Sequence, residues 1–218
     1  MKYKGIIFDF DGTLVNTIED LTDSLNCTLR ELQQMEVTLD EGKHLIGRGL
    51  RNFIKDALPE AFREDHAYVD QATELLKSEY QKRYITKTKP YAGIEALLAT
   101  LKKEAIPFGI NTNKPTDAAK YITKNLFNIE DFVDICGFSK NYPRKPDPTC
   151  ALILAEKMAI QPSECLYIGD SLVDYETARN AKMDALMCEW GFGDKKELSN
   201  LEETQSIRSP KEILKVLK

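Results

Sequence analysis

Residues 6–13 read Ile-Ile-Phe-Asp-Phe-Asp-Gly-Thr, a short apolar run that stops at two aspartates and a glycine. Such a run, bounded by residues that favour turns, is typical of a buried strand in a parallel sheet. Similar runs occupy residues 106–110, 132–136, 165–168 and 185–188, and segments with apolar residues three and four apart lie between them. That spacing indicates amphipathic helices. Alternating strands and helices predict an α/β fold with a doubly wound, Rossmann-like parallel sheet.

The interval between the first apolar run and the second breaks this alternation. Leucines recur on one helical face from Leu21 to Leu32, and a longer charged helical pattern runs from Tyr68 to Tyr80. Residues three and four apart share a helix face, so these patterns predict helices and no strand. We expect residues 16–85 to form a separate all-helical insert and residues 1–15 and 86–218 to form the α/β core.

Polar residues follow several of the predicted strands. In an open parallel sheet, ligands bind beyond the carboxyl ends of the strands. We therefore expect one shared site made of Asp9 and Asp11, Thr112 and Asn113, Lys145, and Asp170 with Asp174. Carboxylates suit Mg²⁺, which binds one or two of them together with phosphate oxygens, and a lysine neutralises phosphate charge. Asp9 and Asp11 are two residues apart and so can face the same side, and Gly12 provides a turn whose N–H groups can hold phosphate oxygens.

The stretch from Asp9 to Val15 resembles motif I of the haloacid dehalogenase superfamily of phosphohydrolases. The later motifs of that superfamily match in order: residues 112–114 (Thr-Asn-Lys), Lys145 in Lys-Pro-Asp-Pro, and residues 169–174 (Gly-Asp-Ser-Leu-Val-Asp). The resemblance covers essentially the whole chain. It implies a Mg²⁺-dependent phosphatase that acts through an aspartyl-phosphate, with residues 16–85 as a helical cap.

The resemblance also implies roles for single residues. It makes Asp9 the nucleophile, and Asp11 the group that protonates the leaving oxygen and then activates water. The expected Mg²⁺ ligands are Asp9, the backbone carbonyl of Asp11, and Asp170, with Asp174 close behind. The expected phosphate contacts are Thr112 and Lys145, to which we add Gly12 and Asn113.

The closest subgroup resembles the phosphoglycolate phosphatases. Residues 47–50 (Gly-Arg-Gly-Leu) and 190–193 (Trp-Gly-Phe-Gly) fit that subgroup. Arg48 lies in a glycine-flanked turn, and arginine binds a carboxylate with two parallel hydrogen bonds. We therefore expect phosphoglycolate or a similar small phosphate as substrate, with Arg48 as a candidate contact. Lys182 departs from the pattern, because a glycine often ends the motif IV helix.

Several alternatives stay open. A phosphotransferase or mutase similar to beta-phosphoglucomutase would usually carry a histidine in the first cap helix, and the only histidines here are His44 and His66. A pyrophosphatase or nucleotidase of the same superfamily would share most of the motifs. An inactive phosphate-binding module would be expected to lose Asp9, Asp11 or Lys145. A receiver-like signalling domain would be shorter and would lack the helical insert.

The composition of the chain limits the classes of partner that we expect. Lys and Arg number 30 and Asp and Glu 35, a formal charge of −5, which argues against nucleic acid as the main partner. The five cysteines form no Cys-x-x-Cys pair, so we expect reduced thiols and a cytoplasmic protein. No apolar stretch approaches the roughly 20 residues of a membrane span. The expected partner is a small phosphorylated metabolite, and the oligomeric state is left open.

Overall fold

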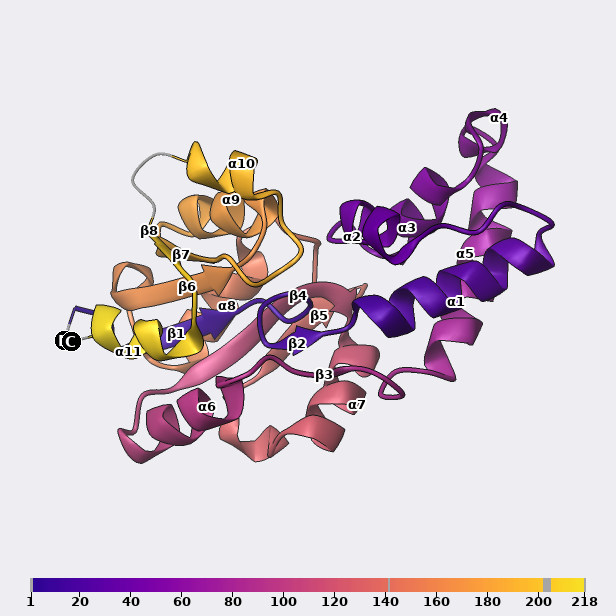
Figure 1. Cartoon of the computed structure of the whole chain (residues 1–218). Coiled ribbons are helices and arrows are strands. Elements are labelled where there is room, and N and C mark those ends of the chain that lie inside the picture. Colours follow the sequence, from indigo (N-terminus) through magenta and orange to yellow (C-terminus); the bar gives the residue numbers. More distant parts are fainter. Residues whose placement is uncertain (1, 141, 202–204, 218) are drawn as a thin grey trace. The chain divides into compact units, whose positions relative to one another are not determined.

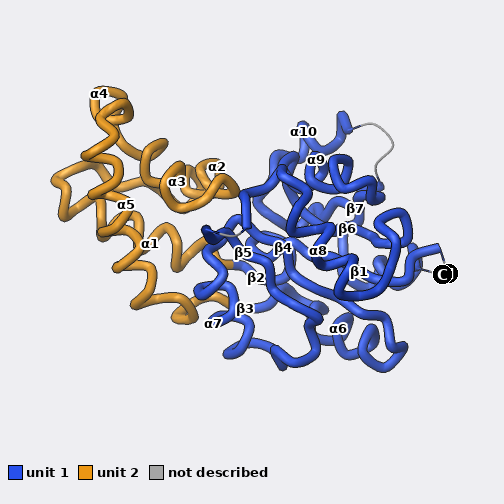
Figure 2. The backbone as a smooth tube through the Cα atoms, turned by 180° about the vertical axis from the view of Figure 1, so that it is seen from behind, with its two compact units in different colours: residues 1–16, 90–218 blue, residues 17–89 orange. Residues whose placement is uncertain are grey.

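The computed structural model describes residues 2–140, 142–201 and 205–217, and the chain forms two compact units (Figures 1 and 2). Unit 1 consists of residues 1–16 and 90–218, and unit 2 consists of residues 17–89. The insert expected from the sequence was residues 16–85. Each unit is described separately below.

Unit 1 is built on a six-stranded sheet with the order β5-β4-β1-β6-β7-β8. Every neighbouring pair is parallel, and the central strand β1 pairs its Ile7 with Gly109 on one side and Tyr167 on the other. The predicted parallel sheet is therefore confirmed. The strands are β1 (Gly5–Phe8), β4 (Phe108–Pro115), β5 (Ile135–Phe138), β6 (Cys165–Gly169), β7 (Asp184–Cys188) and β8 (Gln205–Ile207).

Helices cover both faces of this sheet. Figure 1 shows α6 and α7 on one side and α9 on the other. An apolar cluster joins α8 and α9 to the sheet through the buried side chains of Ile7, Cys136 and Tyr167. The chain first adds β4 and β5 on one side of β1 and then β6 and β7 on the other. The helices are α6 (Ile94–Lys103), α7 (Thr116–Leu126), α8 (Thr149–Lys157), α9 (Leu172–Asn180), α10 (Lys195–Ser199) and α11 (Ile213–Val216), with 3₁₀ turns at Ile129–Asp131, Pro162–Glu164 and Pro210–Glu212.

Several strand predictions need correction. The run at 132–136 predicted a strand there, whereas the strand begins only at Ile135. Phe132 packs its ring 5.0 Å from that of Phe108, so its apolar character reflects an aromatic contact and not a strand position. Strand β8 was not predicted, because Gln205 and Ser206 are exposed at the sheet edge and leave no apolar run. The two-residue strands β2 (Val15–Asn16) and β3 (Lys89–Pro90) form a small second sheet and were also not predicted.

Lys182 ends the turn after α9 in a left-handed conformation, with φ 58°. Its N–H donates to the carbonyl of Arg179, and the N–H of Met183 donates to that of Ala178. These bonds satisfy the last carbonyls of the helix in the way that a glycine usually allows. The lysine therefore preserves the turn that the family pattern normally builds with glycine.

Unit 2 is helical, as predicted. The first helix of the unit carries an apolar stripe made of Leu21, Leu25 and Leu29. This stripe packs against Phe53 and against the buried face of the helix at residues 66–81, around Leu76. Burial of this stripe is the main source of stability for such a bundle. The helices are α1 (Ile18–Glu31), α2 (Leu39–Leu45), α3 (Leu50–Ala57), α4 (Glu60–Arg63) and α5 (His66–Gln81). Every described helix of the chain is too short or too polar to span a bilayer.

A buried carboxylate ties the start of unit 2 to its end. Asp20, fully buried in the first turn of α1, accepts hydrogen bonds from the backbone N–H of Lys87 and from both the N–H and the hydroxyl of Thr88. The two bonds to Thr88 are each 2.7 Å long. Asp20 therefore replaces water for three donors in the segment that leaves the unit.

Candidate active site

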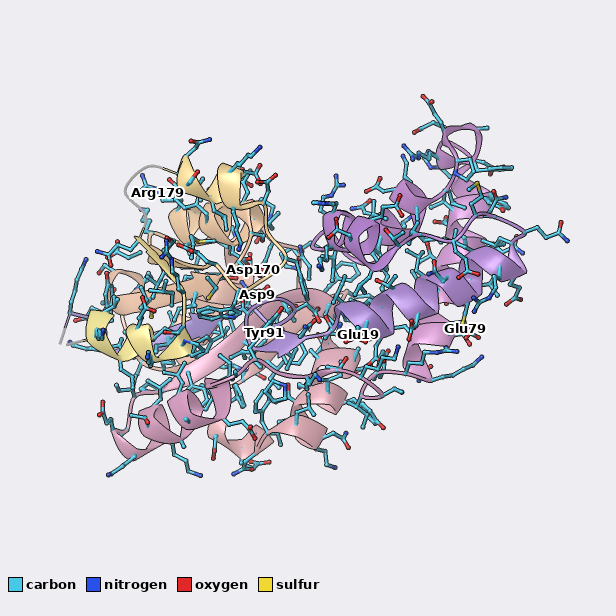
Figure 3. The ribbon with its side chains drawn as sticks, viewed as in Figure 1. Asp9, Glu19, Glu79, Tyr91, Asp170 and Arg179 are labelled. Atoms are coloured by element: carbon cyan, nitrogen blue, oxygen red, sulfur yellow. The ribbon has the colours of Figure 1, made fainter. Side chains whose placement is uncertain are left out.

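The candidate site lies where strand order reverses in the sheet. Strands β1 and β6 are neighbours, and Asp9 and Asp170 come directly after them. The N–H of Asp9 continues the ladder by donating to the carbonyl of Ile168 at 2.8 Å. Open α/β sheets bind ligands at such a reversal, beyond the carboxyl ends of the strands. Figure 3 shows Asp9 and Asp170 near each other at this edge.

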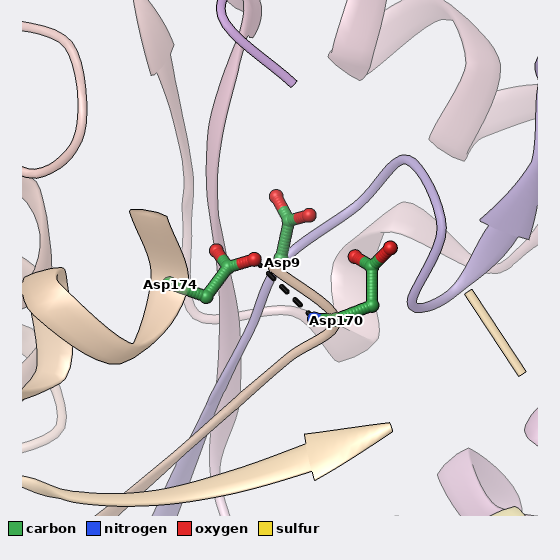
Figure 4. A group of neighbouring side chains, drawn as sticks. All are labelled: Asp9, Asp170 and Asp174. Atoms are coloured by element: carbon green, nitrogen blue, oxygen red, sulfur yellow. Dashed lines mark hydrogen bonds between the residues drawn. The ribbon is translucent and has the colours of Figure 1, made fainter. Parts of the chain in front are cut away.

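Three carboxylates gather there (Figure 4). Asp9, Asp170 and Asp174 each place an oxygen within 4.8 Å of the others, and their residues are 6%, 3% and 0% exposed. Burial, with the negative charge of Asp174, raises the pKa of Asp170 to about 7. The same two causes raise the pKa of Asp9 well above its usual value. The cluster therefore favours a cation or a proton.

Lys145 supplies one positive charge to this cluster. Its Nζ lies 2.5 Å from Oδ1 of Asp9 and 2.7 Å from Oδ1 of Asp174. Burial lowers the pKa of Lys145, but the negative charges of Asp174 and Asp9 outweigh that effect and leave the pKa well above its ordinary value. The lysine is therefore an ammonium in this site.

Asn113 positions Lys145 through the backbone. Its Oδ1 accepts from the N–H of Lys145 at 2.8 Å, and its Nδ2 donates to the Lys145 carbonyl at 3.4 Å. A contact between Asn113 and phosphate stays a prediction. The contacts found here make its side-chain amide a clamp on the loop that carries Lys145.

Asp174 organises the loop after β6. Besides the bond to Lys145, its Oδ2 accepts from the hydroxyl of Ser171 at 2.6 Å and from the N–H of Ser171 at 3.1 Å. A Cβ on Gly169 would lie only 2.2 Å from the Cβ of Asp174, so the strand must end in glycine for this close approach. Both carboxylate oxygens of Asp174 thus accept hydrogen bonds from protein groups.

Two loops close around Asp170. Its Oδ2 accepts from the N–H of Phe192 at 2.7 Å, and its Oδ1 accepts from the hydroxyl of Thr13 at 3.1 Å. Cβ atoms on Gly12 or Gly191 would each come 2.3 Å from Asp170 Oδ2. Gly12 also has φ 93°, a conformation that glycine favours. Residues 190–193, quoted from the sequence only as a subgroup feature, therefore shape the carboxylate cluster.

A further ion pair lies on the same edge. Lys114 Nζ lies 2.9 Å from Oδ1 and 3.0 Å from Oδ2 of Asp11, and the side chain of Lys114 is only 3% exposed. The N–H of Lys114 also donates to Oγ1 of the buried Thr112 at 3.1 Å. Lys114 lies in one of the sequence motifs but was not predicted as a site residue. The signal was present, because Thr112 and Lys114 are two apart on one strand and share a face.

Arg48 belongs to unit 2, whereas the other expected site residues belong to unit 1. Its Nη2 lies 2.7 Å from Oδ2 of Asp56. Arg51 and Lys55, which follow it on α3, pair with Asp70 and Glu64. A contact between Arg48 and substrate stays a prediction.

The donor set fits a divalent cation. The cluster contains three buried carboxylates and the ammonium of Lys145, so it carries a charge of −3 + 1 = −2 when all four groups are ionised. All the candidate ligand atoms are oxygens, which suits Mg²⁺ or another hard cation. The arrangement can therefore hold a metal beside a carboxylate and a phosphate.

The chain is similar to known hydrolases. A family model described as haloacid dehalogenase-like hydrolase matches residues 6–188. The phosphoglycolate phosphatase of Psychrobacter arcticus is 29% identical over 95% of this chain and 92% of its own length. That of Aquifex aeolicus is 30% identical over 86% of this chain and 85% of its own. A crystal structure of a candidate phosphoglycolate phosphatase from Lactobacillus delbrueckii subsp. bulgaricus superposes with a TM-score of 0.93 at 27% identity, covering 100% and 99% of the two chains.

Proposed function

The chain belongs to the haloacid dehalogenase-like hydrolases, as its motifs predicted, and it is a phosphatase of that family. We propose that it is Mg²⁺-dependent and hydrolyses phosphoglycolate or a similar small phosphate monoester through an aspartyl-phosphate. The observation that carries the proposal is the contact of Asp9 with Lys145 inside the carboxylate cluster. The relatives named phosphoglycolate phosphatase support the substrate class.

The proposed reaction has two steps. In the first, a carboxylate oxygen of Asp9 forms a bond to phosphorus while the bond from phosphorus to the ester oxygen breaks, and Asp11 donates a proton to the leaving oxygen. In the second, water attacks the phosphorus and gives a proton to Asp11. The bond between Asp9 and phosphorus then breaks, which releases phosphate and regenerates both aspartates.

Charge stabilisation is assigned to groups around Asp9. Lys145 and Thr112 would hold the phosphoryl oxygens, and Asn113 would keep Lys145 in place. Asp9, the backbone carbonyl of Asp11, and Asp170 would hold Mg²⁺, with Asp174 close behind. When bound, Mg²⁺ would supply positive charge that offsets the repulsion between a carboxylate and a phosphate dianion.

The helical unit 2 is proposed as the cap that selects the substrate, with Arg48 as its candidate contact. Caps of this kind close over a site and exclude bulk water. We also propose a cytoplasmic location. The cysteines at positions 27, 136, 150, 165 and 188 are all free, which supports a reducing compartment.

A phosphate-release screen over phosphorylated metabolites tests the function. We expect release with Mg²⁺ and none with a chelator, and phosphoglycolate or a close analogue among the best substrates. Acid quench during turnover followed by peptide mass spectrometry should find phosphate on the peptide that contains Asp9. Turnover of aryl phosphates that persists fully in the chelator would refute the metal dependence, and a phosphorylated peptide elsewhere would refute the nucleophile.

A further inference from the structure

Lys114 is a buried cation that the proposed mechanism leaves without a role. Its side chain is 3% exposed, it lies at the carboxyl end of β4, and its ammonium contacts both oxygens of Asp11. Burying an ammonium is costly unless negative groups face it. Because burying the ammonium of Lys114 costs free energy, its place on the ligand-binding edge of the sheet indicates a function beyond packing.

The two buried lysines pair with different aspartates, so they would face different parts of a bound ester. Lys145 contacts Asp9, the proposed nucleophile, so it lies on the phosphoryl side. Lys114 contacts Asp11, the proposed proton donor to the leaving oxygen, so it lies on the alcohol side. This division follows from the ion pairs alone and assigns the second cation to the part of the substrate that leaves.

The distances bring substituents of the alcohol within reach of Lys114. A proton donor lies about 2.6–3.2 Å from the oxygen it protonates. Since Lys114 Nζ is 2.9 Å from an oxygen of Asp11, it lies within about 6 Å of the leaving oxygen when that contact forms. A carboxylate attached to the ester carbon that points toward Lys114 could therefore bond the ammonium directly.

We infer that Lys114 is a specificity-determining residue that favours esters whose leaving alcohol carries a carboxylate on the ester carbon, the phosphorylated small 2-hydroxy acids. This inference rests on the proposed function, because it uses Asp11 as the proton donor. It places the cation that recognises the carboxylate in unit 1, whereas the sequence suggested only Arg48 of unit 2 for that purpose.

Steady-state kinetics on two matched esters test the inference. The esters are 2-phosphoglycolate and its carboxamide analogue, carbamoylmethyl phosphate, which has the same number of heavy atoms but no carboxylate charge. We expect the wild-type protein to prefer the carboxylate in kcat/KM. Lys114→Met should lower kcat/KM for phosphoglycolate about 10- to 100-fold more than for the amide, the loss expected for one hydrogen bond to a charged group. Lys114→Arg should keep part of the preference.

Lys103→Met is the matched control. Lys103 is an exposed lysine in the last turn of α6, so this variant removes the same charge from the same unit without touching the site. The variant should leave kcat/KM for both esters unchanged. Equal losses on the two esters in Lys114→Met would overturn the inference and leave Lys114 as a positioning residue for Asp11.

Two further results separate failure of this inference from failure of the proposed function. A wild-type protein that hydrolyses both esters equally well overturns the inference without any variant, so an unstable Lys114→Met protein does not block the test. A wild-type protein that hydrolyses neither ester and no aryl phosphate overturns the proposed function, and the inference falls with it. Circular dichroism of each variant establishes that the fold is kept.

Discussion

The ammonium of Lys145 contacts the carboxylate of Asp9 at 2.5 Å, although 136 positions separate the two residues in the chain. The same ammonium contacts Asp174, whose other oxygen holds the loop after β6. One buried cation therefore links the loops that follow three different strands. Activity and stability of the site should both depend on it.

Asp9→Asn should lower kcat by at least about three orders of magnitude, because an amide cannot form the acyl-phosphate. Burial and Asp174 raise the pKa of Asp9, so a neutral side chain at position 9 should be well tolerated by the fold in the absence of metal. Phosphate release and the thermal midpoint of the metal-free protein measure the two effects. Asp40→Asn, at an exposed position in unit 2, is the control and should change neither. Near-normal turnover by Asp9→Asn would show that another group attacks phosphorus.

Lys145→Met should destabilise the metal-free protein by about 3–5 kcal/mol, because it removes one partner of a buried ion pair and leaves the carboxylates facing each other. Urea unfolding in the presence of a chelator measures this. Lys157→Met is the control, since Lys157 pairs with Asp134 while 45% exposed, and surface pairs contribute about 0–1 kcal/mol. Equal free energies of unfolding for the two variants would contradict the structural role of Lys145.

The contribution of Asp170 to the stability of the metal-free protein should fall as the pH rises from about 4 to about 7. The pKa of Asp170 is about 7 in the folded protein, whereas the ordinary value of 3.8 applies to the unfolded chain. The folded state therefore binds that proton more tightly. Its stabilising contribution is therefore complete below the unfolded pKa and is lost as the pH passes the folded one. Asp170→Asn should flatten this part of the profile. Thermal melts of both proteins from pH 4 to pH 8 give the comparison, and identical slopes would argue against a proton held by Asp170.

Mg²⁺ should stabilise the protein more at pH 8 than at pH 6, because it competes with the proton on Asp170. At a concentration 100-fold above the dissociation constant, a single site gives about 2.7 kcal/mol. Thermal melts over a Mg²⁺ titration measure the shift. Asp170→Asn should abolish most of it. A shift that stays the same in this variant would place the metal elsewhere.

Asp20→Ala should destabilise the protein by about 2–4 kcal/mol, because three donors in the segment at Lys87 and Thr88 lose their acceptor. Asp23→Ala removes a neighbouring ion pair to Lys87 whose side chains are 46% and 45% exposed, and it should cost less than about 1 kcal/mol. Urea unfolding of both variants tests the difference. Similar losses would mean that the buried bonds of Asp20 contribute little.

Local patterns predicted most of the fold. The parallel sheet around β1 and the helices of unit 2 follow from apolar runs and from apolar residues three and four apart, which report on each segment alone. The pattern failed where a segment's role depends on its neighbours. Phe132 has the apolar character of a strand residue but packs against Phe108, and the polar edge strand at residues 205–207 is held only by its pairing with β7.

The candidate site was predicted in outline and incompletely in its contacts. Motif spacing predicted that Asp9, Lys145 and Asp170 belong to one shared site. It did not indicate that Asn113 clamps the backbone of Lys145, or that the N–H of Phe192 binds Asp170. Such contacts join loops that are remote in sequence, and their partners depend on the course of each loop.

By itself, the sequence determined the order and type of most elements and the family of the chain, because both depend on short-range periodicity and on motifs a few residues long. Only the tertiary structure decided which cation faces which carboxylate. Lys145 faces Asp9 and Lys114 faces Asp11 because parallel pairing aligns the ends of β1 and β4 and because the loop from β5 returns to the same edge. Ion pairs that span more than a hundred residues depend on that alignment, and no local pattern contains it.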